Sequence, residues 1–150
     1  MKPVSMPLLI SLIALVHSAS CAGTPESDVA EKLQLKIGQT QLRLEGREGM
    51  CNAIASTVGG TTSQYALRIP WPCRFHTDKA GNIRTIQEAG FAYVLLESSR
   101  RTINLSNDCE THLQAIRVRG QSIEISQHKD RVASCPPFQW DTVLFTELFN

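Results

Sequence analysis

The sequence has almost no excess of charge of either sign and no long apolar run. Its 15 Lys and Arg stand against 14 Asp and Glu, so the charge balance gives no reason to expect nucleic acid or an anionic membrane surface as a partner. The main apolar run, residues 8–16, has about half of the roughly twenty residues that a membrane-spanning helix needs. We therefore expect this run to be something other than a membrane anchor.

The usual motifs of catalysis, phosphate binding and structural zinc are also missing. No serine lies in a Gly-x-Ser-x-Gly elbow, and the pair Gly59-Gly60 lacks the Gly-Lys-Ser/Thr ending of a phosphate-binding loop. The cysteines form no Cys-x-x-Cys pair of the kind that holds zinc. We therefore expect no cofactor and no metal, and we expect catalysis only from an enzyme without a recognisable motif.

The N-terminus has the layout of an export signal. The basic residue Lys2 precedes the apolar run, and the small residues 18–20 follow it. Cleavage is expected after Ser20 or after Ala22, which makes residues 1–22 the signal peptide. Because Lys2 leaves with the signal, the balance of the mature chain becomes 15 − 1 = 14 basic against 14 acidic residues.

Residues 18–21, Ser-Ala-Ser-Cys, resemble a bacterial lipobox, in which the cysteine becomes the lipidated first residue of the mature chain. Ser18 departs from that pattern, because an aliphatic residue is usual there. A lipid on Cys21 would be the only expected link to a membrane; the alternative is an ordinary signal peptide with an incidental cysteine. Residues 23–32 are then a tether or a short helix, and residues 33–150 a single domain.

Four cysteines remain: Cys51, Cys73, Cys109 and Cys135. An even number in a chain directed to an oxidising compartment favours two disulfides over a zinc site or a nucleophilic thiol. A Gly120-Gln121 turn would pair Val118 with Ile123, Arg117 with Glu124 and Ile116 with Ile125. The same ladder, continued, places Cys109 opposite Val132 and near Cys135. We therefore predict the pairs Cys51–Cys73 and Cys109–Cys135.

Alternating apolar residues predict several further strands. Residues 33–37 and 40–44 form a hairpin about Gly38-Gln39, with Leu35 opposite Leu42. Residues 67–75 predict a strand that Pro70 and Pro72 confine to a sheet edge. Residues 91–96 are apolar on both faces and predict a central strand.

Three predictions concern the segments between and after these strands. The four-residue spacing of Met50, Ile54 and Val58 suggests a short helix within residues 46–60. Residues 98–100 are expected to be a loop between paired strands. Asp141 is expected to cap a short C-terminal helix, with a terminal strand as the alternative.

The fold class that follows is mainly β, with two disulfides. We expect a small antiparallel sheet or a partly open barrel or sandwich, with one or two short helices.

The densest group of polar residues is Asp108, Glu110, His112, His128 and Asp130. The predicted register places Leu113 opposite His128, so the two imidazoles would lie on diagonal positions and could bind zinc or act as acid and base. The simpler interpretation is a solvated hairpin end, with Lys129 and Arg131 opposing a cation. His76 near Asp78 is likewise explained by surface polarity.

Three aromatic side chains are better candidates for binding. Trp71, Phe138 and Trp140 lie on stiff, proline-containing backbone, and tryptophan is enriched at interface hot spots. The alternative is that both tryptophans cap the core. We therefore expect an exported, periplasmic or extracellular, non-enzymatic protein-binding module, such as an inhibitor of a lytic enzyme or an immunity protein against a secreted toxin. The alternatives are a small hydrolase or metal-dependent enzyme using His112 and His128, and a structural lipoprotein.

Overall fold

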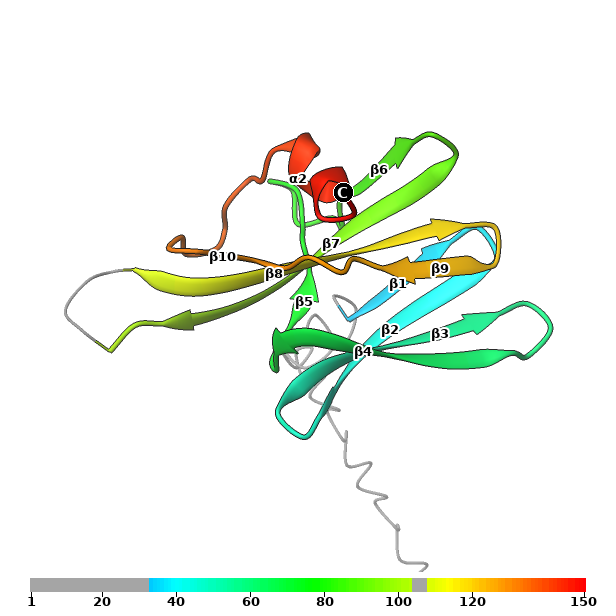
Figure 1. Ribbon diagram of the computed structural model, residues 1–150, viewed down its shortest axis with the longest axis horizontal. Helices are drawn as coiled ribbons and strands as arrows, with labels where there is room; N and C mark the ends of the chain where they lie inside the picture. The colour runs from blue at the N-terminus through cyan, green and yellow to red at the C-terminus, as the bar shows by residue number, and fades with distance from the viewer. Residues whose placement is uncertain (1–32, 104–107) are drawn as a thin grey trace, which may run out of the picture.

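The computed structural model describes residues 33–103 and 108–150, so the predicted signal peptide, Cys21 and the 23–32 segment lie outside the described residues. The described chain forms two antiparallel sheets (Figure 1). Sheet A has the order β1 (Gln34–Ile37), β2 (Thr40–Arg47), β3 (Met50–Thr57), β4 (Thr62–Pro70). Sheet B has the order β10 (Asp130–Val132), β8 (Cys109–Arg119), β7 (Phe91–Arg101), β5 (Arg74–Phe75); β6 (Thr85–Glu88) also pairs with β7, and β9 (Ser122–Ile125) with β8. The predicted mainly β class is confirmed.

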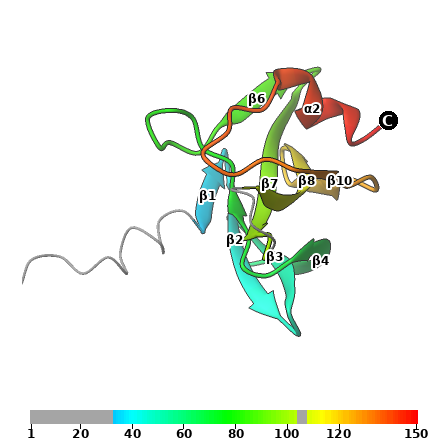
Figure 2. The same ribbon diagram turned by 90° about the vertical axis from the view of Figure 1, so that its left-hand side faces the viewer.

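The two sheets pack face to face over the larger of two apolar clusters. Its buried members come from both sheets and include Leu42, Leu44, Ile69, Phe75, Val94, Leu96 and Ile116. The second cluster lies on the other face of sheet B, where the C-terminal segment covers Tyr93, Leu95 and Leu113. Figure 2 shows the C-terminal helix α2 and sheet A on opposite sides of β7 and β8. These two strands are therefore buried on both faces, as the apolar run at residues 91–96 predicts.

Two of the predicted hairpins have the predicted register. Leu35 pairs with Leu42 in the first, and Val118 pairs with Ile123 in the second, with the two flanking pairs as expected. Gly38 and Gly120 have φ angles of 57° and 61°, a left-handed conformation that glycine adopts without steric cost. The turn residues and the cross-strand pairs thus agree on one register.

Both predicted disulfides are present. Cys51–Cys73 joins β3 to the connection between β4 and β5. Cys109–Cys135 joins the start of β8 to the segment that leads into the C-terminal helix. One bridge therefore staples the sandwich, and the other ties the C-terminal segment to sheet B.

The prediction of edge strands from Pro70 and Pro72 is confirmed, but the predicted single strand at residues 67–75 is interrupted. β4 ends at Pro70 on the edge of sheet A, and β5 begins at Arg74 on the edge of sheet B. The three residues between them carry the chain from one sheet to the other. Trp71 thus lies in the connection between the two sheets and not within a strand.

The predicted helix within residues 46–60 is wrong, because this segment is strand β3. Its core-facing residues are small, namely Cys51, Ala53 and Ala55. On the neighbouring strand β2 the core-facing side chains are bulkier; Leu42, for example, pairs with Ala55. Small residues make a weak period-two signal, so the four-residue spacing of the larger side chains misled the prediction.

The predicted loop at residues 98–100 is also wrong. β7 continues to Arg101, which pairs with Cys109 on β8. The Ser99 hydroxyl is hydrogen-bonded to the Thr111 hydroxyl, whose proton goes to the carbonyl of Ser134. The hydroxyl of Ser99, which suggested a loop, is therefore hydrogen-bonded within the ladder.

The register predicted below the last hairpin is shifted by two residues. Ile116 pairs with Ile125, but Leu113 pairs with Asp130, so β8 advances by three residues while its partner advances by five. The excess lies in residues 126–129, where the Gln114 amide donates to the Ser126 carbonyl. Thr111, rather than Cys109, is therefore the partner of Val132.

The predicted C-terminal helix is present as α2 (Thr142–Glu147). The Asp141 carboxylate accepts a 3.0 Å hydrogen bond from the Val143 amide, as an N-cap residue does. Phe145 faces inward and is fully buried.

Candidate functional site

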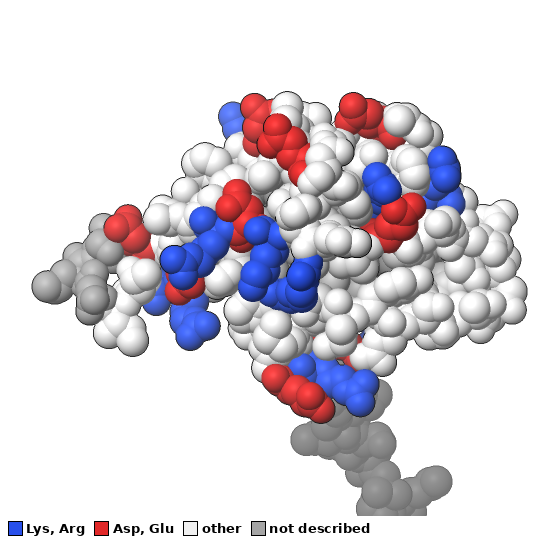
Figure 3. Space-filling model, viewed as in Figure 1, with Lys and Arg blue, Asp and Glu red and all other residues white. Residues whose placement is uncertain are grey.

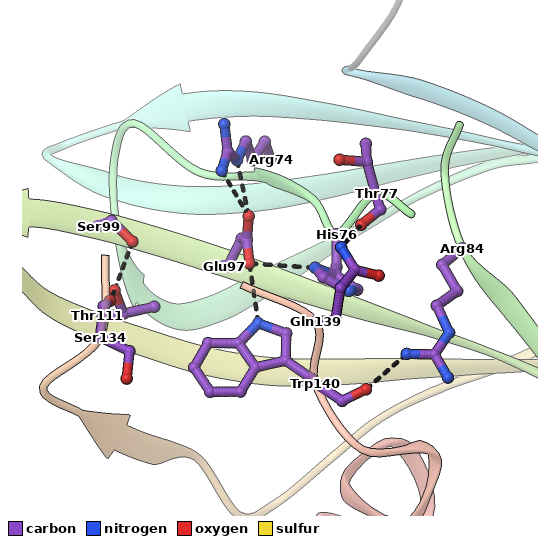
Figure 4. A network of polar contacts seen from close by, with 10 residues as sticks. All are labelled: Arg74, His76, Thr77, Arg84, Glu97, Ser99, Thr111, Ser134, Gln139 and Trp140. Atoms are coloured by element: carbon purple, nitrogen blue, oxygen red, sulfur yellow. Dashed lines mark hydrogen bonds and ion pairs between the residues drawn. The ribbon is translucent and has the colours of Figure 1, made fainter. Parts of the chain in front are cut away.

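The most extensive buried polar network is centred on Glu97 of β7 (Figure 4). Its side chain is 3% exposed. Arg74 on β5 donates from Nε and Nη2 to Oε1, at 2.8 and 2.7 Å. His76 Nδ1 lies 3.3 Å from Oε2, and Trp140 Nε1 donates to the same oxygen at 3.0 Å. One carboxylate thus joins the central strand, the edge of sheet B and the C-terminal segment.

The contacts keep Glu97 ionised despite its burial. Desolvation raises the pKa of its carboxyl, but the hydrogen bonds from His76 and Trp140 and the charge of Arg74 lower it by more. The pKa of Glu97 is therefore below its ordinary value. A buried carboxylate of this kind is stable only while its partners stay in place.

His76 and Glu97 have the hydrogen bond that orients a catalytic histidine, but the ring is inaccessible. His76 is 2% exposed, so the interpretation of its surroundings as surface polarity is wrong. Its Nε2 has no hydrogen-bond partner among the described residues, and the ring meets Phe145 edge-on at 6.1 Å between centroids. A substrate could not reach Nε2 without displacing α2, so we assign the pair to positioning the C-terminal segment.

Further contacts hold that segment on sheet B. Arg84 donates to the carbonyl of Trp140 and to the hydroxyl of Thr142. The Gln139 amide donates to the carbonyl of Thr77 at 3.2 Å. With the Cys109–Cys135 bridge, these contacts fix the segment along its length.

The polar group predicted from the sequence is only partly brought together. Glu110 Oε1 lies 3.1 Å from His112 Nε2 and 3.3 Å from Arg131 Nη1. The shifted register places Asp130, not His128, opposite Leu113, and the exposed His128 donates its backbone N–H to the carbonyl of Leu148.

No group of three or more His, Cys, Asp or Glu side chains within residues 33–103 and 108–150 is arranged to hold a metal ion. Asp108, at the end of the same strands, provides its backbone carbonyl to Thr102.

The three aromatic candidates differ in accessibility. Trp140 is 7% exposed, so it is a core residue and leaves the set of surface candidates. Phe138 is 44% exposed, and its ring lies 4.5 Å from that of Trp140. Trp71 is 36% exposed, at the end of the sandwich where β4 leaves sheet A.

The indole ring of Trp71 packs against Gly46, at a position where only glycine leaves room for the ring. A Cβ atom at Gly46 would lie 2.7 to 2.8 Å from three atoms of the indole ring, closer than real contacts allow. The Trp71 backbone N–H donates to the carbonyl of Gly49 at 3.0 Å. The Cys51–Cys73 bridge and Pro72 border the same site. The indole is thus held rigidly with about a third of its surface open to solvent.

A second exposed apolar side chain lies at the same end of sheet A, on its opposite face. Met50 begins β3, pairs with Pro70 at the end of β4 and is 40% exposed. The sequence pattern identified Trp71 but not Met50 or Gly46, because neither their spacing nor their type marks them out. The link from Glu97 to Trp140 gave no sequence signal either.

No protein-family model matches the sequence, and comparison with characterised proteins and with solved structures gives no significant match. None of the helices in the described part of the chain has the length and hydropathy to cross a bilayer.

Proposed function

We propose that the protein is an exported, non-enzymatic protein-binding module that uses Trp71 and Met50 as its contact residues. The observation that carries the proposal is the rigid, partly exposed indole of Trp71 on Gly46. An aromatic side chain that is already immobilised loses little entropy on binding, and tryptophan and methionine are enriched at interfaces.

Export is supported by the two disulfides, which form and persist in oxidising compartments. An inhibitor of a lytic enzyme and an immunity protein against a secreted toxin both fit a small, stapled binding domain outside the cytosol. The alternative enzyme based on His112 and His128 is less well supported, because the register places Arg131 opposite His112 and leaves His128 outside β10. The structural lipoprotein depends on Cys21, outside the described residues.

The test is capture of a stoichiometric partner from an envelope extract by the immobilised protein. We expect W71A and M50A each to weaken capture by about tenfold or more, since truncation of a hot-spot residue costs about 2 kcal/mol. V143A is the matched control, because Val143 is 52% exposed on α2, away from this site. Equal capture by all four proteins would contradict the proposal.

A further inference from the structure

The strands β7 and β8 extend well beyond the part of sheet B that packs on sheet A. Their pairing continues from Ser98 opposite His112 to Arg101 opposite Cys109. In Figure 1 this two-stranded arm projects past the end of sheet A. Arg100 and Glu110 lie opposite each other on this arm, whereas residues 92–97 of β7 and 113–118 of β8 are mostly buried.

Besides Arg101 at the end of the arm, four exposed cations lie on the arm, on β10 and the residue before it, and on the neighbouring edge of sheet A. They are Arg68, Arg100, Lys129 and Arg131, and we call them the basic corner. Lys129 Nζ donates to the carbonyl of Arg68 at 3.5 Å, which joins the start of β10 to β4. The Gln114 side chain accepts a 2.7 Å hydrogen bond from the Arg68 amide and ties β8 to the same edge. Figure 3 shows basic side chains gathered in this region, with acidic side chains between them.

The acids nearby offset only part of this charge. Glu110 faces Arg131 and His112 and pairs across the ladder with Arg100. Asp130 pairs with Leu113, whose side chain belongs to the cluster on the outer face of sheet B. The side chains of Arg68 and Lys129 form no ion pair with an acid in the described part of the chain.

The basic corner and the site of Trp71 meet at the end of β4, on opposite faces of sheet A. Arg68 shares the outer face with Pro70 and its partner Met50, whereas the indole of Trp71, three residues after Arg68, lies over Gly46 on the face that carries Cys51. An apolar anchor beside unpaired cations matches a partner that has an apolar pocket bordered by carboxylates.

We infer that the protein partner presents a carboxylate-bearing surface, which the basic corner binds while Trp71 fills an adjoining apolar pocket. The inference rests on the proposed function and specifies the chemistry of its partner. Arginine favours carboxylates because its planar guanidinium can donate two parallel hydrogen bonds to them. Charge complementarity of this kind speeds association and excludes wrong partners.

A protein fits these observations better than a polyanion or a bilayer. The whole chain has a formal charge of only +1, and the four cations occupy one local site. Nucleic acids and anionic membranes bind through extended basic surfaces. A partly exposed tryptophan packed on the protein surface is typical of an interface anchor.

The experiment compares R68E/K129E with the control K36E/K79E, which changes the net charge equally at exposed lysines on β1 and in the loop before β6. Binding to the captured envelope partner is measured at about 50 mM and about 300 mM salt, because exposed charges are screened over about 10 Å at 0.1 M. A short peptide of alternating Asp and Leu, its Asn-for-Asp analogue, and phosphatidylglycerol vesicles are tested as defined probes.

We expect R68E/K129E to weaken partner binding at least about tenfold, K36E/K79E to bind as the unmodified protein does, and salt to weaken binding. The Asp peptide should compete with the partner, and the Asn analogue should not. If W71A loses binding while R68E/K129E and salt have no effect, the inference is overturned and the proposed function stands. If R68E/K129E loses binding and W71A does not, the basic corner stands and Trp71 is not the anchor. Vesicle binding that R68E/K129E abolishes, without peptide competition, overturns the assignment to a protein.

Discussion

The indole N–H of Trp140 donates a 3.0 Å hydrogen bond to the carboxylate of Glu97, 43 residues earlier in the chain. Arg74 and His76 complete the contacts of that carboxylate, so three chain segments meet at one buried charge. The stability of the C-terminal segment is thereby coupled to the central strand of sheet B. This coupling makes the network accessible to experiment.

Replacing Glu97 with Gln should destabilise the protein by about 3 kcal/mol. Arg74 is 44% exposed, so water still solvates its charge, and the loss comes mainly from the hydrogen bonds to the buried carboxylate, each worth about 1.5–3 kcal/mol. Gln retains the size of the side chain, so the loss reflects charge and hydrogen bonding. Urea unfolding at pH 7 measures the effect. E110Q is the control at an exposed ion pair and should change stability by less than about 1 kcal/mol; similar losses in the two variants would refute the role of Glu97.

The same residue should make stability depend on pH. The folded pKa of Glu97 is lowered from its ordinary value of 4.5, so above that pH both states are ionised and its full stabilisation is present. As the pH falls below 4.5, the unfolded chain takes up the proton first, and stability is lost until the folded protein is also protonated. Urea midpoints measured at successively lower pH should therefore fall more steeply for the native protein than for E97Q. Parallel curves would contradict this prediction.

Gly46→Ala should displace the indole of Trp71. The added Cβ would lie 2.7 Å from ring atoms, so either the ring or strand β2 must move, at a cost of about 1–3 kcal/mol. In a W71A background the same substitution should cost much less, because its steric partner is gone. Unfolding free energies of the four proteins give this coupling, and a coupling near zero would show that Trp71 does not rest on Gly46.

Removing the Cys109–Cys135 bridge should loosen the C-terminal segment more than the sandwich. The bridge spans 26 residues, which corresponds to about 3 kcal/mol in the chain-entropy treatment of disulfides. In a W71F background, where Trp140 is the sole tryptophan, acrylamide should quench fluorescence more strongly in C109A/C135A than in C51A/C73A. Equal quenching in both would mean that the Glu97 network alone holds Trp140 in place.

Mass spectrometry of the exported protein should show removal of the signal. Cleavage after Ser20 leaves Cys21 first, with a diacylglycerol mass if the lipobox is used, and cleavage after Ala22 leaves Gly23 first. A C21A variant separates the two, because it abolishes lipid attachment but leaves cleavage after Ala22 intact. An unprocessed N-terminus would contradict the export signal.

The parts of the fold that the sequence predicted are those in which local signals agree. At Gly120-Gln121 a turn glycine, two apolar pairs and one ion pair, Arg117 with Glu124, all require the same register. β3 was missed because its inward residues are small, and the end of β7 because the partners of Ser99 are distant in sequence. The predicted register beyond the last hairpin assumed that β9 and β10 form one continuous strand paired with β8. Residues 126–129 interrupt that strand, so the register there was wrong.

The candidate site was predictable to a smaller extent. Two prolines identified Trp71 as unusual, but its exposure depends on Gly46, which lies on another strand. Trp140 looked equally suited to an interface from its Pro-Pro-Phe-Gln-Trp context. Only the three-dimensional pairing with Glu97 shows that it is buried. Long-range contacts of this kind leave no local trace in one sequence.

The two additional residues at 126–129 suggest how the length of this connection between β9 and β10 can vary. Successive side chains of a strand point to opposite faces of the sheet. An insertion or deletion of two residues therefore leaves the following side chains on the same face, whereas a change of one residue moves them to the other face. Val132 keeps its place in the cluster on the outer face of sheet B, beside Thr111. Deleting one residue there would turn Val132 to solvent and Arg131 toward the apolar cluster, whereas deleting two would spare both. Natural variants of this chain should therefore differ here by pairs of residues.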